Sequence, residues 1–276
     1  MKKLIILFIF LISANLLAND YQVNQLKAEL TEGQFEATTY LPLKAKVKAI
    51  IVLTPTIAGV SILEKTLAKY FSKEGFLVII PLPYDGEVEN LKPDVVKLDD
   101  DFLKPAIAAE KFITMVEEKF NLPTNLPVFA LGASQGGIRS LIIASHSPRI
   151  TAAWFATAGG DFASIYAKSK VKTISEFKVK HMNFLGITND LVYEEYLRDN
   201  LKNDPAIACR NIKVPFVQVM TLKDDKVPTA NQKILIDNCP KHKVITIDNG
   251  HIVGSLSTLK WKKQIKDFFL QQITKK

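Results

Sequence analysis

The residues best suited to chemistry lie in the segment Gly132-Ala133-Ser134-Gln135-Gly136-Gly137. An apolar run ends at Leu131 and an apolar-periodic run begins at Ile138, so the segment is expected to be a tight turn between a strand and a helix. Such a turn strains the serine backbone, and the flanking glycines remove Cβ atoms that would collide. The Ser134 hydroxyl would then be exposed at the positive end of a helix, where a nucleophile is useful.

A serine nucleophile needs a base, and the base needs a group that orients it. Both residue types follow later in the chain, each after an apolar run that is typical of a buried strand. Asp224 follows the run at 216–221, and His251 follows the run at 244–247. Groups at the carboxyl ends of parallel strands gather at one edge of a sheet, so Ser134, Asp224 and His251 are expected to meet there. Asp225 and Asp161 remain alternative carboxylates.

These residues lie within motifs by which the chain resembles the α/β-hydrolase superfamily, specifically secreted or periplasmic serine esterases and dienelactone-hydrolase-like proteins. The resemblance covers about residue 50 to the C-terminus and rests on three segments in the family's order: Gly132-x-Ser134-x-Gly136, Asp224-x-x-Val227-Pro228 and Gly250-His251. It implies an α/β-hydrolase fold and cleavage of small carboxylic esters through an acyl-enzyme. Ser134 would be the nucleophile, His251 the general base and acid, and Asp224 the orienting acid, with no metal and no organic cofactor.

The resemblance also implies two backbone N–H donors for the oxyanion that forms during ester cleavage. One is the N–H of Gln135, and the other comes from the loop after the strand that ends at Leu53. The family commonly has His-Gly in this loop, whereas this chain has Pro55-Thr56 before Ile57-Ala58-Gly59. Alignment makes Ile57 the donor, and a shift of one residue would make it Thr56.

Strand and helix patterns alternate along most of the chain. The continuous apolar run at 49–53 is typical of a strand buried on both faces, and further strands are predicted at 76–80, 127–131, 152–156, 214–221 and 243–247. Helical periodicity lies between them and at 256–274. This alternation predicts a mostly parallel twisted sheet covered by helices on both faces. Ahead of it, residues 23–30 and 34–41 alternate apolar and polar side chains around a Glu-Gly pair, which predicts an antiparallel hairpin.

Residues 161–210 interrupt the alternation and show helical periodicity. The segment is rich in Lys, Tyr and Glu. It is short and polar, so it is expected to form a helical, lid-like insertion without a core of its own.

The first 18 residues have the pattern of a secretory leader. Two lysines precede an apolar run at 4–12, and Ala18 provides a small residue for cleavage. The apolar stretch is shorter than the roughly 20 residues that a membrane anchor needs. A secreted or periplasmic protein is therefore expected, with residues 19–276 forming one domain and no membrane span after cleavage.

The chain has 276 residues, a net charge of +8 and two cysteines. Its lysines are scattered, without an arginine cluster or an interleaved aromatic stripe, so no nucleic-acid partner is expected. Cys209 and Cys239 each precede a predicted strand, and would lie at the same edge of the sheet if those strands are neighbours. An oxidising compartment permits a disulfide between them, and two buried free thiols are the alternative.

Other functions remain open at this level. A Ser-His-Asp triad also serves peptidases and thioesterases, and the same scaffold can act as a catalytically silent binding protein.

Overall fold

The protein is described here by a computed structural model, which covers residues 20–31, 33–57, 59–82 and 95–274. The predicted leader at 1–18 lies outside these residues. The described residues form one eight-stranded sheet in the order β1-β2-β4-β3-β5-β6-β7-β8. The strands are β1 (Tyr21–Leu30), β2 (Gly33–Pro42), β3 (Ala49–Thr54), β4 (Phe76–Pro81), β5 (Val128–Ala133), β6 (Ile150–Ala156), β7 (Phe216–Thr221) and β8 (Lys243–Ile247).

The sheet is antiparallel only at its N-terminal side. β1 and β2 form the predicted hairpin, and β2 pairs antiparallel with β4. The remaining pairs, from β4 and β3 through to β8, are parallel. The carboxyl ends of β5, β7 and β8, where the candidate residues follow, therefore lie at the same edge of the sheet.

The central parallel strands are almost entirely apolar because both faces of the sheet are covered there, whereas the edge strand β8 exposes Lys243 and Thr246. In β3, Ile50 and Val52 pack into one core cluster, whereas Ile51 and Leu53 pack into the cluster on the opposite face. Side chains alternate between faces with a period of two, so a strand buried on both sides has no room for an exposed polar position. The continuous apolar runs in the sequence reflect this arrangement.

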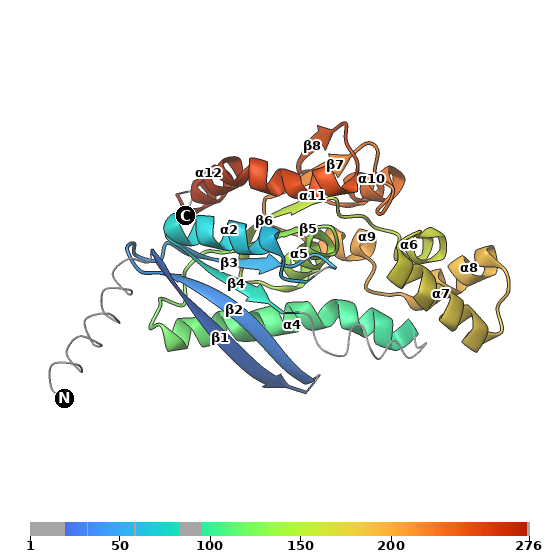
Figure 1. Cartoon of the computed structure of the whole chain (residues 1–276), viewed down its shortest axis with the longest axis horizontal. Coiled ribbons are helices and arrows are strands. Elements are labelled where there is room, and N and C mark those ends of the chain that lie inside the picture. Colours follow the sequence, from blue (N-terminus) through green and yellow to red (C-terminus); the bar gives the residue numbers. More distant parts are fainter. Residues whose placement is uncertain (1–19, 32, 58, 83–94, 275–276) are drawn as a thin grey trace, which may run out of the picture.

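Helices form a layer on each face of the sheet (Figure 1). One layer contains α2, α11 and α12, and the other contains α4 and α5. The helices of the main body are α2 (Ile62–Lys73), α4 (Val95–Lys119), α5 (Gln135–His146), α10 (Thr229–Asn238), α11 (His251–Lys260) and α12 (Lys262–Ile273). The fold is the predicted mostly parallel sheet with helices on both sides.

The last predicted helix differs from the structure. The range 256–274 was expected to be a single helix, but it is divided between α11 and α12, and α11 begins five residues earlier, at His251. The first turns of α11 expose Ile252 and Val253 and bury Gly254 and Ser255. Because this pattern reverses the usual placement of apolar and small polar side chains, hydrophobic periodicity does not reveal the start of the helix.

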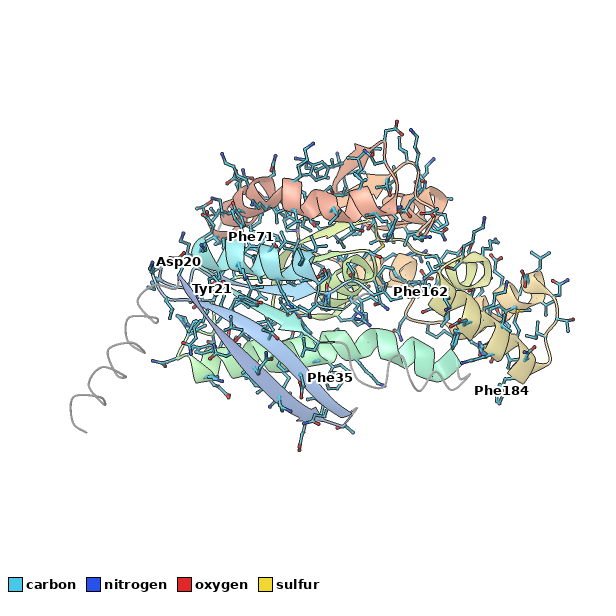
Figure 2. All side chains as sticks on the ribbon, in the orientation of Figure 1. Asp20, Tyr21, Phe35, Phe71, Phe162 and Phe184 are labelled. Atoms are coloured by element: carbon cyan, nitrogen blue, oxygen red, sulfur yellow. A yellow bond between two sulfur atoms is a disulfide. The ribbon has the colours of Figure 1, made fainter. Side chains whose placement is uncertain are left out.

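The segment at 161–210 is helical, as expected, and most of it lies beyond the carboxyl ends of the strands (Figure 1), whereas its last residues pack against α5 and lead to the start of β7. It contains α6 (Phe162–Lys168), α7 (Lys172–Leu185), α8 (Asp190–Asn200), α9 (Pro205–Ala208) and the 3-10 helix η1 (Cys209–Asn211). Its buried side chains, which include Phe177, Tyr193 and Leu197, belong to the same cluster as the sheet core. The side chain of Phe184, at the end of α7, is exposed at the far end of the segment (Figure 2).

Cys209 and Cys239 form a disulfide, one of the two alternatives left open by the sequence. Cys209 begins η1, just before β7, and Cys239 ends α10, just before β8. Since β7 and β8 are neighbours in the sheet, the residues that precede them are close in space.

Candidate active site

Ser134 occupies the tight turn between β5 and α5. Its backbone has φ 56° and ψ −128°, a conformation that is uncommon for any residue other than glycine. A Cβ at Gly132 would overlap the Gly136 carbonyl, and a Cβ at Gly136 would overlap the Thr54 carbonyl. The predicted reason for the two glycines is therefore correct: strand, turn and helix approach too closely for side chains at either position.

Two threonines hold this turn in place. The Thr54 hydroxyl, at the end of β3, donates to the Gly136 carbonyl at 2.5 Å and lies 2.6 Å from the Ser140 hydroxyl. The Ser134 N–H donates to the Thr157 hydroxyl at 3.0 Å and to the Ala156 carbonyl at 2.9 Å. The turn is thus fixed to both strands that flank β5.

Thr157 itself has an unusual backbone. Its φ is 51°, which is a genuine outlier for a β-branched side chain. The residue is fully buried just after β6, and its hydroxyl also lies 3.1 Å from the hydroxyl of Ser255 on α11. Thr157 therefore connects the nucleophile turn to the helix that begins with His251.

Asp224 lies in the loop after β7, with a side chain that has no exposed surface. One oxygen accepts hydrogen bonds from the backbone N–H groups of Lys226 and Val227, each at 2.9 Å. The other accepts from Thr221 Oγ1 at 2.8 Å and from Gln232 Nε2 at 2.9 Å. Burial raises the pKa of this carboxyl, but the hydrogen bond and charge of His251 and the backbone donors outweigh burial, and the net pKa is lowered.

His251 joins the other two residues through its imidazole ring. Its Nδ1 lies 2.9 Å from Asp224 Oδ2, and its Nε2 lies 2.8 Å from Ser134 Oγ. The carboxylate can only accept, so Nδ1 carries the proton and Nε2 is left to accept from the Ser134 hydroxyl. The structure brings Ser134, His251 and Asp224 together in one continuous hydrogen-bonded chain.

The alternative carboxylates lie in other interactions. Asp225 is largely exposed and pairs with Lys226 at 3.1 Å. Asp161 caps α6 and pairs with Arg198 at 2.8 Å. Neither Asp225 nor Asp161 makes the contact with His251 that Asp224 makes.

The loop after β3 lies against the turn that contains Ser134. Gln135 is the first residue of α5, and a Cβ at the next residue, Gly136, would meet the carbonyl of Pro55. The Thr56 N–H donates to Glu64 Oε1 at 3.1 Å. No acceptor among the described residues pairs with the N–H of Ile57, whose side chain is half exposed.

Sequence reasoning did not identify Thr157, Gln232 or Glu64. Each acts through a contact with a residue 8 or more positions away in the chain. Thr157 and Gln232 belong to no local motif, and the capping box that Glu64 forms with Ser61 does not reveal its bond to Thr56. Thr221, which bonds to Asp224, directly precedes the predicted loop and could have been noted as the last residue of its strand.

Two further properties concern the part of the chain that the structure describes. Within it, no group of three or more His, Cys, Asp or Glu side chains is arranged to hold a metal ion. Across the same ranges, no helix combines the length and the apolarity that crossing a membrane requires.

A scan against protein-family models found no match, and a search of curated proteins found no relative. Solved structures do match. An acylaminoacyl peptidase from Pyrococcus horikoshii superposes with a TM-score of 0.69 at 16% identity, over 94% of this chain and 43% of that chain. A cold-adapted esterase from an Arctic intertidal metagenomic library superposes with a TM-score of 0.59 at 11% identity, over 92% of this chain and 95% of that chain.

A Mycobacterium tuberculosis puromycin-hydrolyzing peptidase gives a TM-score of 0.67 at 15% identity, over 92% of this chain and 39% of that chain. This chain thus spans about two fifths of the length of the two peptidases and almost the whole length of the esterase. Together with the sheet order, these matches show that the protein has an α/β-hydrolase fold. The narrower resemblance to dienelactone-hydrolase-like proteins stays a prediction.

Proposed function

We propose that this protein is a serine hydrolase that cleaves carboxylic esters through an acyl-enzyme. The observation that carries the proposal is the hydrogen-bonded chain from Ser134 Oγ through His251 to Asp224, with distances of 2.8 and 2.9 Å. A serine hydroxyl is a weak nucleophile by itself, and an adjacent oriented base is what activates it.

In the first half of the reaction, Ser134 Oγ attacks the ester carbonyl while His251 Nε2 accepts the hydroxyl proton. Asp224 holds the imidazole in the required tautomer and stabilises the imidazolium that forms. The lowered pKa of Asp224 suits this role because the carboxylate remains ionised at neutral pH. His251 then donates the proton to the leaving alcohol, which departs and leaves the acyl group on Ser134.

In the second half, water takes the place of the alcohol. His251 accepts a proton from the water, whose oxygen attacks the acyl carbonyl, and then returns the proton to Ser134 Oγ as the carboxylic acid leaves. Both halves pass through a negatively charged oxygen, for which we assign the backbone N–H groups of Gln135 and Ile57. Thr56 is the poorer candidate because its N–H is already bonded to Glu64.

The surface beside His251 favours an ester with an apolar portion. On α11, Ile252, Val253 and Leu256 are 69%, 51% and 46% exposed. Large apolar side chains exposed next to a reactive group are typical of surfaces that contact a ligand. Aryl esters of increasing acyl length should therefore be hydrolysed with falling KM, and a variant with Ser at these three positions should lose that trend.

A peptidase is the second candidate, because two of the matching structures are peptidases by name. A thioesterase and a catalytically silent binding protein use the same scaffold. The kcat/KM values for a panel of aryl esters, thioesters and peptide anilides distinguish an esterase, a thioesterase and a peptidase. The ester proposal predicts turnover of esters by the wild type and none by S134A; failure of the folded wild type on all three classes would support the silent protein.

The disulfide also supports the proposed export of the protein, since disulfides persist mainly in oxidising compartments. Expression with its native leader, followed by fractionation, tests whether the chain leaves the cytoplasm and loses residues 1–18.

A further inference from the structure

The carboxylate of Glu64 is buried close to the nucleophile turn, outside the Ser134–His251–Asp224 chain. The side chain is 1% exposed and lies on the first turn of α2. Together with Thr54, Gly132 and Ala133, it lines a small cavity of about 10 Å³. A carboxylate this deeply buried is costly unless its oxygens accept hydrogen bonds, so its partners indicate what it does.

One carboxylate oxygen of Glu64 takes part in the cap of α2. Glu64 Oε2 accepts from the Ser61 N–H at 2.8 Å, and the Ser61 hydroxyl in turn accepts from the Leu63 N–H at 3.1 Å. This reciprocal pair is a capping box, a common device for starting a helix. It does not involve the other carboxylate oxygen.

That second oxygen reaches outside the helix. Glu64 Oε1 accepts from the Thr56 N–H at 3.1 Å, eight residues earlier in the chain. Thr56 begins a turn that is closed by a bond from the Gly59 N–H to the Thr56 carbonyl at 2.9 Å, and Ile57 follows within this turn. Glu64 thus ties the turn that contains Ile57 to the rigid start of α2.

We propose that Glu64 is a positioning residue for the oxyanion site, because its carboxylate engages the Thr56 N–H and holds the loop so that the Ile57 N–H is the donor. This inference rests on the proposed function. Pro55 has no N–H to offer, so with Thr56 engaged, Ile57 is the first residue after β3 whose amide is available. An oxyanion donor works only when its position is fixed before the reaction, which a loop tied at Thr56 achieves and an untethered loop does not.

The test compares E64A with S61A. Both variants disrupt the capping box, but only E64A releases the Thr56 N–H, so S61A controls for the loss of the helix cap. Three quantities are measured on each folded variant: melting temperature, the kcat and KM for an aryl ester, and the affinity for an aryl boronic acid, which forms a tetrahedral adduct with the serine.

We expect E64A to lower kcat by about 10- to 100-fold, with KM within about threefold of the wild type, and to weaken boronic acid binding by a similar factor. S61A should stay within about threefold in kcat and boronate affinity even though its melting temperature falls. E64Q, which retains one oxygen for Thr56, should fall between E64A and the wild type. If E64A does not fold, E64L, which also removes both oxygens but fills the buried volume, takes its place in the comparison with S61A.

Equal kcat and boronate affinity in S61A and the Glu64 variant would overturn the inference and leave the hydrolase proposal intact. A folded wild type that neither turns over esters nor binds the boronic acid would overturn the proposed function, and the inference with it.

Discussion

At the scale of single residues, the site is held by hydroxyl, amide and carboxylate groups that each have several partners. Asp224 accepts four hydrogen bonds from protein groups other than His251, which fixes its orientation. Buried carboxylates whose oxygens are satisfied in this way stay ionised and rigid. The chemistry therefore depends on residues beyond the three that would react.

Asp224 and its neighbour Asp225 offer a matched pair of variants. We expect D224N to lower kcat by about 10³- to 10⁴-fold, because the amide favours the wrong imidazole tautomer and cannot stabilise the imidazolium. D225N should retain nearly full activity, since this side chain is exposed and pairs with Lys226. Steady-state ester hydrolysis measures both, and equal losses in the two variants would contradict the assignment of Asp224.

Thr157 allows a second matched comparison. T157V keeps the β-branched shape but removes the hydroxyl that accepts from the Ser134 N–H, and we expect kcat to fall about 10-fold and stability by about 1–2 kcal/mol. T157S keeps the hydroxyl and should stay within about twofold of the wild-type kcat. The same kinetic assay decides: a T157V variant as active as T157S would show that the hydroxyl does not position the nucleophile.

The residues that could be predicted from the sequence are those that lie in a recognisable local sequence pattern. Ser134 lies between glycines, and Asp224 and His251 each follow an apolar strand. Thr157 and Glu64 act through tertiary contacts, so their roles depend on which strands and loops become neighbours, and no local pattern carries that information.

At the scale of elements, the position of α11 determines the distance between His251, its first residue, and Ser134. The helix packs its small residues, Gly254 and Ser255, against the sheet and exposes its aliphatic residues. Small side chains allow the helix to approach the carboxyl ends of β6 and β7 closely. The same reversed pattern explains why the beginning of α11 was not predictable from hydrophobic periodicity.

Gly254 tests this close approach. A Cβ at this position would overlap the methyl groups of Thr221 and Thr157, so G254A should push α11 away from the sheet and separate His251 from Ser134. We expect a loss of about 1–3 kcal/mol in stability and at least a 10-fold loss in kcat. Adding T221S removes one of the methyl groups while keeping the hydroxyl that bonds Asp224, and should restore part of both losses. Wild-type behaviour of G254A would contradict the proposed packing.

At the scale of the whole molecule, strand-helix alternation was sufficient to predict a mostly parallel sheet covered by helices on both faces, because its central strands leave continuous apolar runs. The helical segment at 161–210 was predictable as helical but not in its packing. Its buried Tyr193 and Phe177 are spaced among charged residues, and only the arrangement of α6, α7 and α8 brings them together. A role for this segment as a lid stays a prediction.

The disulfide is expected to contribute to the stability of the whole domain. It closes a loop between residues 30 positions apart, for which the chain-entropy model gives about 3–4 kcal/mol. The double variant C209S/C239S should therefore melt roughly 10 °C lower than the wild type. Thermal unfolding with and without a reductant measures the effect; reductant should lower the melting temperature of the wild type only. Equal melting temperatures for the two proteins would contradict a structural role for the disulfide.

The central claim is that Ser134 is an activated nucleophile, and covalent labelling tests it most directly. A fluorophosphonate probe reacts with a serine that an adjacent base activates, and peptide mass spectrometry locates the modified residue. The account predicts one equivalent of label on Ser134 in the wild type, none in S134A and strongly slowed labelling in H251A. A folded wild type that takes up no label, or that is labelled on another residue, would contradict it.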